Sequence, residues 1–192
     1  MIGVVGLVSG CTASSPYLIP EDVVGSESRS AIQVMVTPVV TSGIGSEQRA
    51  RYGVDLSAYF TAFEVRVVNR SKSRLTFDPR AFTMSLTGAV WHPFDEEESL
   101  AYYRRGTLQD GKSIVLVEKP YATIRKEMDR IVSLRLKPGS VEPEQSAQGL
   151  IYFKKVSPEA CGKITLDIRG VTVVSTGEGK NFRFSFSCPK EG

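Results

Sequence analysis

Hydrophobic and polar residues alternate along most of the chain, a pattern typical of β-strands with one buried face. The clearest case is the last run, where Phe182, Phe184 and Phe186 alternate with polar residues. A short continuous β-branched run at Ile114–Val117 predicts a buried strand. The same reasoning predicts further strands at Ala31–Val40, Tyr59–Asn69, Leu75–Phe77, Phe82–Leu86, Ser133–Lys137, Gln148–Lys155 and Lys163–Val174.

Two segments depart from this period and predict helices. Asp95–Arg105 begins with four acidic residues, ends with two basic ones and is followed by Gly106, an order that suits the helix dipole and a glycine C-cap. A second helix is expected to start at Pro120, a residue permitted in the first turn. Its apolar positions fall on one helical face: Tyr121, Ile124, Met128 and Ile131. The segment Glu47–Ala58 stays ambiguous.

Many short strands separated by turn residues, with one or two short helices inserted, predict a mainly β protein. The expected fold is an antiparallel immunoglobulin-like β-sandwich. No internal repeat and no boundary between two folded domains is evident, so residues 30–192 are expected to form one domain. Residues 11–29 are rich in Ser, Pro, Gly, Glu and Asp without periodicity, which predicts a flexible tether.

Composition and charge narrow the possible functions. The hydrophobic fraction is 41% and the net charge is +3, from 24 basic and 21 acidic residues. This mild excess argues against a nucleic-acid partner, which calls for a clustered basic face. His92 is the only histidine, which excludes a multi-histidine metal site. The acidic run Asp95–Glu98 lacks the alternating oxygen ligands and central glycine of an EF-hand, so we expect no metal and no cofactor.

The first residues change character abruptly at one cysteine. Residues 1–7 are apolar and uncharged, Val8-Ser9-Gly10-Cys11 follow, and the chain then becomes small and polar. This tetrapeptide resembles the lipobox of bacterial lipoproteins. The resemblance implies that residues 1–10 are a signal-peptide remnant and that Cys11 carries lipid and becomes the mature N-terminus. Without acylation, the same residues would form a short apolar strand with a free thiol.

The resemblance also implies a location in the cell envelope. A lipid on Cys11 makes the bilayer the first partner, and Thr12 rather than Asp after the cysteine favours the periplasmic face of the outer membrane. Signal peptides begin with a basic segment, yet no Lys or Arg precedes Arg29. We therefore expect that basic segment to lie upstream of Met1.

The two remaining cysteines, Cys161 and Cys188, form an even pair in a compartment that permits disulfides. Cys161 opens one predicted strand and Cys188 closes the last. If these strands pair antiparallel, a bridge between the two cysteines is geometrically reasonable. The alternative is two unconnected small apolar residues.

Residues Gly106–Ser113 satisfy the P-loop pattern letter for letter. A working P-loop follows a strand and opens a helix, so that backbone N–H groups cradle phosphates. Here a helix precedes the motif and a β-branched run follows it. We therefore interpret it as a helix-to-strand connection and expect no nucleotide partner.

An aromatic and basic group is the remaining candidate for surface contacts. Trp91, Tyr102 and Tyr103, with Arg104 and Arg105, are candidates for contact with a partner or a glycan. Such residues equally often cover the edge of a sheet.

Together these patterns favour a non-enzymatic, membrane-anchored binding or scaffold module with an envelope protein as partner. One alternative is an envelope hydrolase with its site in the 91–130 insertion. It would need His92 to meet a nucleophile and a carboxylate, and no Gly-x-Ser-x-Gly elbow is present. The other alternative is a sandwich that binds polysaccharide through Trp91, Tyr102 and Tyr103.

Overall fold

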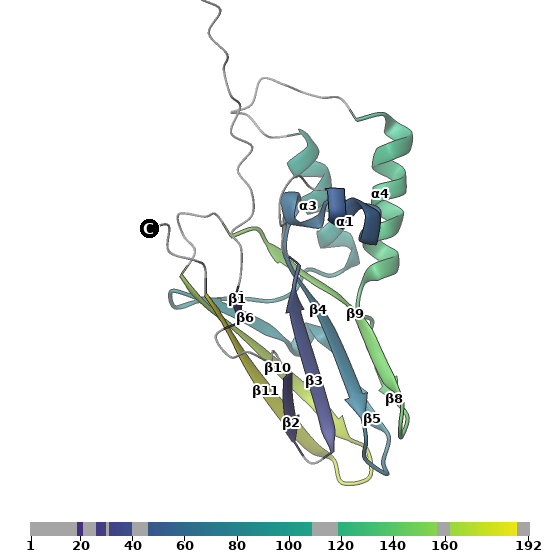
Figure 1. The fold of residues 1–192 in the computed structure, drawn as a ribbon, viewed down its shortest axis with the longest axis vertical. Helices are drawn as coiled ribbons and strands as arrows, with labels where there is room; N and C mark the ends of the chain where they lie inside the picture. Colours follow the sequence, from purple (N-terminus) through teal and green to yellow (C-terminus); the bar gives the residue numbers. More distant parts are fainter. Residues whose placement is uncertain are drawn as a thin grey trace, which may run out of the picture.

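Two antiparallel β-sheets pack face to face, and a layer of helices covers one end of them (Figure 1). The computed structural model describes residues 19–20, 26–29, 31–39, 46–108, 119–156 and 162–187. Within these residues the protein is mainly β, with antiparallel sheets and a few short helices, as the hydrophobic pattern predicts.

Among the described residues, the larger sheet has seven strands in the order β1-β11-β10-β5-β8, with β6 pairing to β10 and β7 pairing to β6. β10 is the central strand of this sheet. The bounds of its members are β1 Ile19–Pro20, β5 Leu75–Phe77, β6 Thr83–Leu86, β7 Ala89–Trp91, β8 Gly139–Val141, β10 Lys163–Val173 and β11 Glu178–Ser187.

The smaller sheet has four strands in the order β2-β3-β4-β9. Its members are β2 Ser26–Arg29, β3 Ile32–Pro38, β4 Phe60–Asn69 and β9 Ser146–Lys154. The presence of β1 and β2 corrects part of the expected tether, because Ile19–Pro20 pair with the end of β11 and Ser26–Arg29 pair with β3. Backbone pairing in a ladder outweighs the polar composition of these short segments.

The space between the sheets is filled by the apolar positions of the alternating runs, which confirms the predicted inward faces of the main strands. Phe63 on β4 meets Phe186 on β11 at a ring-centroid distance of 5.1 Å, so the two sheets touch directly. Both rings are fully buried. The sheet core also contains Ile32, Val34, Val36, Val65, Val67, Phe82, Met84, Leu86, Ile164, Leu166, Ile168, Phe182 and Phe184.

A bulge in β10 lets this one strand pair with two strands on the same side. Its register shifts between Ile168 and Val171, where Gly170 adopts a φ of 73°. Before the bulge β10 pairs with β6, and after it with β5. A 3₁₀ turn at Pro79–Ala81 links these two partners. The proline that interrupts the alternation thus marks a change of pairing position along one edge.

The helical layer contains α1 Ser46–Tyr52, α2 Leu56–Tyr59, α3 Glu96–Leu108 and α4 Tyr121–Leu134. Both predicted helices exist, but α3 continues through Gly106. An added Cβ there would lie 3.1 Å from Cδ1 of Tyr59, and Gly106 has no positive φ. The glycine therefore permits the close approach of a ring and does not end the helix.

The second helix also differs in detail from the prediction. Tyr121 is 79% exposed, while the buried positions of α4 are Glu127 and Ile131. The strand expected at Ser133–Lys137 is wrong, because the apolar face of α4 continues to Leu134 and only Arg135 forms a β-bridge. The strand expected at Ile114–Val117 lies outside the described residues.

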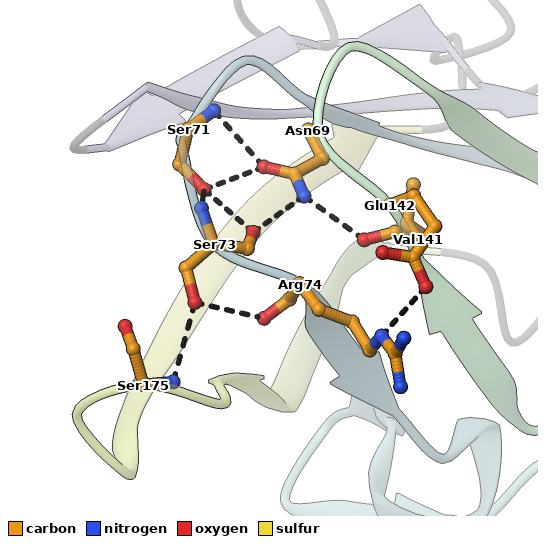
Figure 2. Close-up of polar contacts among 7 residues, drawn as sticks. All are labelled: Asn69, Ser71, Ser73, Arg74, Val141, Glu142 and Ser175. Atoms are coloured by element: carbon orange, nitrogen blue, oxygen red, sulfur yellow. Dashed lines mark hydrogen bonds and ion pairs between the residues drawn. The ribbon is translucent and has the colours of Figure 1, made fainter.

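The end of the sheets away from the helices is held by one buried amide (Figure 2). Asn69, at the end of β4, is fully buried. Its Nδ2 donates to the carbonyls of Ser73 at 2.8 Å and Val141 at 2.9 Å, and its Oδ1 accepts from the Ser71 backbone at 2.9 Å. The Ser175 backbone in turn donates to Ser73 Oγ at 3.2 Å. This network joins the turns that follow β4, β8 and β10.

Candidate functional site

A pocket lies where the helical layer meets the sheets. Its volume is about 570 Å³, within the range of small-ligand and peptide side-chain sites. Three connecting segments form its walls: residues 78–80 after β5, residues 93–96 before α3 and residues 135–138 after α4. Leu150 and Ile151 of β9 also line it, and both are buried.

The wall after α4 is fixed by an unusually close crossing of two backbones. The Leu136 N–H donates to the Leu150 carbonyl at 2.8 Å, and Arg135 pairs with Leu150 in parallel. A Cβ on Gly149 would lie 2.5 Å from the backbone nitrogen and Cα of Leu136. Real Cβ atoms do not approach backbone so closely, so the crossing requires glycine at this position of β9.

Arg135 joins the two helices at the pocket. Its Nη1 donates to the Phe94 carbonyl at 2.8 Å and to Ser99 Oγ at 3.1 Å. Burial lowers the pKa of the Arg135 guanidinium, and nearby negative groups, Asp95 and Glu96 among them, oppose this shift. The cation is half-buried, and the two groups to which it donates are neutral.

The start of α3 beside the pocket is a reciprocal capping arrangement. The Glu98 N–H donates to Asp95 Oδ1 at 2.8 Å, while the Asp95 N–H donates to Glu98 Oε2, also at 2.8 Å. Two N–H groups at the helix start are thereby satisfied. The acidic run that was predicted to begin a helix does lie at the start of α3, and Asp95 and Glu98 act as caps.

The pocket combines an apolar floor with a rim of both charges. Asp78 and Arg80 form an ion pair at 2.6 Å on one side, and Lys137 and Glu96 lie exposed on others. The carboxyl of Asp78 has a lowered pKa because Arg80 donates hydrogen bonds to it. Such a site suits an extended polar segment that carries one apolar side chain, and orients it through the rim.

A second polar cluster holds α3 against α4. The Tyr103 hydroxyl donates to Glu127 Oε2, which also accepts from Lys119 Nζ at 2.7 Å. Lys119 donates to the Tyr59 hydroxyl at 2.8 Å and lies 5.1 Å from the centroid of that ring. Burial raises the pKa of Tyr103, and the bond to Glu127 adds to the rise. Burial lowers the pKa of Lys119, but its hydrogen bonds outweigh this and leave it above the ordinary value.

The predicted aromatic and basic group is not brought together on one surface. Tyr103 is fully buried, which corrects its assignment as a surface contact, because its helix face turns toward α4. Tyr102 is half-buried, packs on Phe94 at 4.8 Å and accepts from the Lys155 N–H. Trp91 on β7 packs against the sheet core. Arg104 and Arg105 are exposed.

These placements do not favour the predicted polysaccharide platform. Coplanar exposed rings of Trp91, Tyr102 and Tyr103 are required for it, and the three side chains are instead buried or packed among other residues.

His92 is exposed and does not line the pocket. Its Nδ1 lies 3.4 Å from the Arg80 carbonyl, the one hydrogen-bond contact of the ring within the described part of the chain. The triad required for the hydrolase alternative is therefore not assembled around His92 in that part.

Most of the nucleotide motif and all three cysteines lie outside the described residues. Gly106 lies inside α3, so the motif begins within a helix, while residues 109–113 lie outside the described part. Cys11, Cys161 and Cys188 also lie outside it. β10 and β11 do pair antiparallel, with Lys163 opposite Ser187. The lipid attachment and the disulfide stay predictions.

Within the described ranges, no group of three or more His, Cys, Asp or Glu side chains is placed to hold a metal ion. Nor does any helix in this part of the protein have the length and apolar character needed to cross a membrane.

Sequence reasoning missed the residues that shape the pocket. Arg135 and Leu136 were assigned to a strand, and Gly149 carried no turn signal that would set it apart. The acidic start of α3 did carry a recognisable sequence signal, because Asp95 and Glu98 have the spacing of a capping box.

Comparisons with known proteins identify no family. No protein-family model matches the sequence, and no curated protein matches it. Among solved structures, the fold is similar to a putative lipoprotein (ycdA) of Bacillus subtilis subsp. subtilis str. 168. The TM-score is 0.45 and the identity 16%, over 88% of this chain and 40% of that one, so this chain spans less than half of the Bacillus protein.

Two further structures resemble the chain over most of their own length. The yjhA protein of Bacillus subtilis matches with a TM-score of 0.42 and 9% identity, over 81% of this chain and 93% of that one. A functionally unknown protein of Listeria monocytogenes EGD-e matches with a TM-score of 0.41 and 8% identity, over 93% and 91%.

Proposed function

We propose that the protein is a lipid-anchored module of the bacterial envelope that binds a protein partner and performs no catalysis. Its β body is assigned to the immunoglobulin-like sandwiches, and its anchor is the acylated Cys11 on the periplasmic face of the outer membrane. The lipobox at Val8–Cys11 supports the anchor. The observation that carries the binding role is the pocket between the helices and the sheets.

The pocket is suited to recognition because hydrogen bonds and a close backbone crossing hold its walls in place. Arg135 donates to Phe94 and Ser99, and the backbone crossing at Gly149 holds the same segment, through Leu136, on β9. Preformed sites lose less conformational entropy on binding than mobile ones. The positive and negative charges on the pocket rim then determine the orientation of the bound partner more than its affinity.

Site-specific photo-crosslinking in cells tests the binding role. A photoreactive amino acid replaces Lys137 on the pocket rim, and in a matched control it replaces Val174, which is 52% exposed in the turn between β10 and β11. We expect one discrete adduct from position 137 that Glu96→Arg weakens and Arg70→Glu, at the far end of the sheets, does not. Equal adducts from both positions, or none from 137, contradict the proposal.

The anchor is tested separately. Mass spectrometry of protein from membranes is expected to find a mature chain that begins at acylated Cys11, and Cys11→Ser is expected to release the protein from the membrane fraction. An intact Met1 with an unmodified Cys11 contradicts this part.

A further inference from the structure

The two long helices run antiparallel, so their opposite ends differ in chemistry. Arg135, just after α4, bonds to Ser99 near the start of α3. Tyr103, in the second half of α3, bonds to Glu127 in the first half of α4. The end of α3 and the start of α4 therefore lie together, on the side of the helical layer that points away from the sheets (Figure 1). We call this the outer end.

The outer end is basic and carries an exposed aromatic ring. Arg104 and Arg105 on α3 and Arg125 and Lys126 on α4 are exposed, and Tyr121 is 79% exposed. The dipoles of the two antiparallel helices oppose each other at this end, so its charge is decided by the side chains.

The acidic side chains of α3 and α4 do not neutralise the basic charge of the outer end. The acidic residues of α3, Glu96 to Glu98, lie at the opposite end, beside the pocket. Glu127 is buried and accepts from Lys119, which compensates its charge. Asp129, farther along α4, is the exposed carboxylate nearest in sequence to Arg125 and Lys126.

The chain enters the folded body at the same end as the helices. Ile19 pairs with Ser187, the last residue of β11. The helical end of the smaller sheet is marked by Phe60, the first residue of β4, which follows α2 directly and pairs with Lys154 at the end of β9. Figure 1 shows β1 at the helical end of the larger sheet.

The sequence distance from Cys11 to this point is short. Eight residue steps from Cys11 to Ile19 span at most about 26–29 Å when extended. The 14 residues of α4 rise about 21 Å along the helix axis. A bilayer that holds Cys11 is therefore within reach of the outer end.

We propose that the outer end docks on the anionic phospholipid headgroups of the membrane that holds Cys11, with Tyr121 in the headgroup region. The inference rests on the lipid anchor of the proposed function. Each basic residue near an anionic bilayer contributes favourable electrostatic energy, and tyrosine rings partition to the interface. A basic patch also strengthens an acyl anchor. This contact orients the body so that the pocket, beyond the other end of α3 and α4, faces away from the lipid.

Vesicle sedimentation of the full chain with Cys11→Ser tests the contact without acylation. One set of vesicles contains phosphatidylcholine with phosphatidylglycerol, and the other contains phosphatidylcholine alone. We expect binding to the anionic vesicles that weakens with added salt, and a loss of about tenfold or more in Arg125→Glu/Lys126→Glu. Tyr121→Ala is expected to weaken binding by a smaller factor.

The matched control is Arg70→Glu/Lys72→Glu, which reverses the same number of exposed charges at the far end of the sheets. It is expected to bind like the parent chain. No binding to anionic vesicles, equal binding to both vesicle types, or an equal loss in the control overturns the proposal. The proposal is also overturned if Arg125→Glu/Lys126→Glu loses binding to duplex DNA but keeps its binding to anionic vesicles. Circular dichroism verifies that each variant is folded.

The outcome can be separated from that of the proposed function. Vesicle binding by the unacylated chain does not require a protein partner, and the adduct at position 137 does not require the outer-end cations. Failure of either test alone therefore identifies which statement is wrong.

Discussion

The core between the sheets and the cluster under the helices are stabilised differently. The sheet core is a cluster of aliphatic, methionine and phenylalanine side chains, and the buried amide of Asn69 lies at the end of the sheets away from the helices. The helical cluster contains three buried tyrosines, and Glu127 and Ser99 are buried beside it. Apolar burial is non-directional, whereas a buried polar group requires a partner at a defined position. The packing between the sheets therefore depends mainly on filled volume, apart from the Asn69 network at the far end, whereas the packing of the helices also depends on specific polar pairs.

Tyr152 illustrates the second kind of stabilisation. It lies on β9, yet its hydroxyl reaches past the sheet and donates to the Ile131 carbonyl of α4 at 3.1 Å. Burial raises the pKa of this phenol. The bond fixes α4 on the sheet in one register, which apolar contact alone would not do.

Removing volume from the sheet core is expected to have the largest effect. Phe63→Ala leaves a cavity among rings that include Phe153 and Phe186, and is expected to lower the free energy of unfolding by about 3–5 kcal/mol. Urea denaturation measures the loss. Leu100→Ala in the half-buried periphery of the helical cluster is the comparison and should cost less. Equal losses would remove the distinction between the regions.

Breaking a polar pair in the helical cluster is expected to have the next largest effect. Glu127→Gln removes the charged acceptor of Tyr103 and Lys119 and is expected to cost about 1.5–3 kcal/mol. Its neighbour Asp129 is exposed, so Asp129→Asn is a matched control expected to change stability by less than about 0.5 kcal/mol. Denaturation followed by far-UV circular dichroism measures both. Similar values for the two variants would show that the cluster contributes little.

The junction between the two regions is probed by a single methyl group. Gly149→Ala places a Cβ against the Leu136 backbone and is expected to cost about 1–3 kcal/mol, because backbone cannot move aside cheaply. Gly179→Ala on β11 is the control, since an added Cβ there meets nothing within 4 Å. Hydrogen exchange should locate the loss at Leu136 and the end of α4. Unchanged protection there would contradict the assigned crossing.

The smallest effect is expected on the outer face of the larger sheet. Hydrogen bonds from Arg183 hold the pKa of Asp167 below its ordinary value. A depressed folded-state pKa contributes stability above the unfolded-state pKa of about 4 and loses it as pH falls through the folded-state value. Asp167→Asn should therefore destabilise the protein near neutral pH, and the difference should vanish in acid. A constant difference at every pH would refute this assignment.

The hydrophobic pattern predicted the longer strands and their inward faces, but not the short strands β1, β2, β7 and β8. Phe63, Phe182 and Phe186 were placed correctly because a period of two has one solution once a face is buried. The two longer helices followed from charge order and a 3.6-residue period. Their ends did not, since α3 continues through Gly106, which lies close to Tyr59, and α4 continues to Leu134, which packs on the helical cluster.

The tertiary structure alone decided where function can reside. The local sequence could not show that Tyr103 points inward to Glu127, because the two residues lie on different helices. How two helices pack depends on contacts between distant parts of the chain. Nor could it show that residues after α4 cross β9 at Gly149 and close a pocket, or that the entry of the chain and the basic outer end share one end of the molecule. Periodicity reports which side of an element is buried, whereas a site requires knowing which distant element buries it.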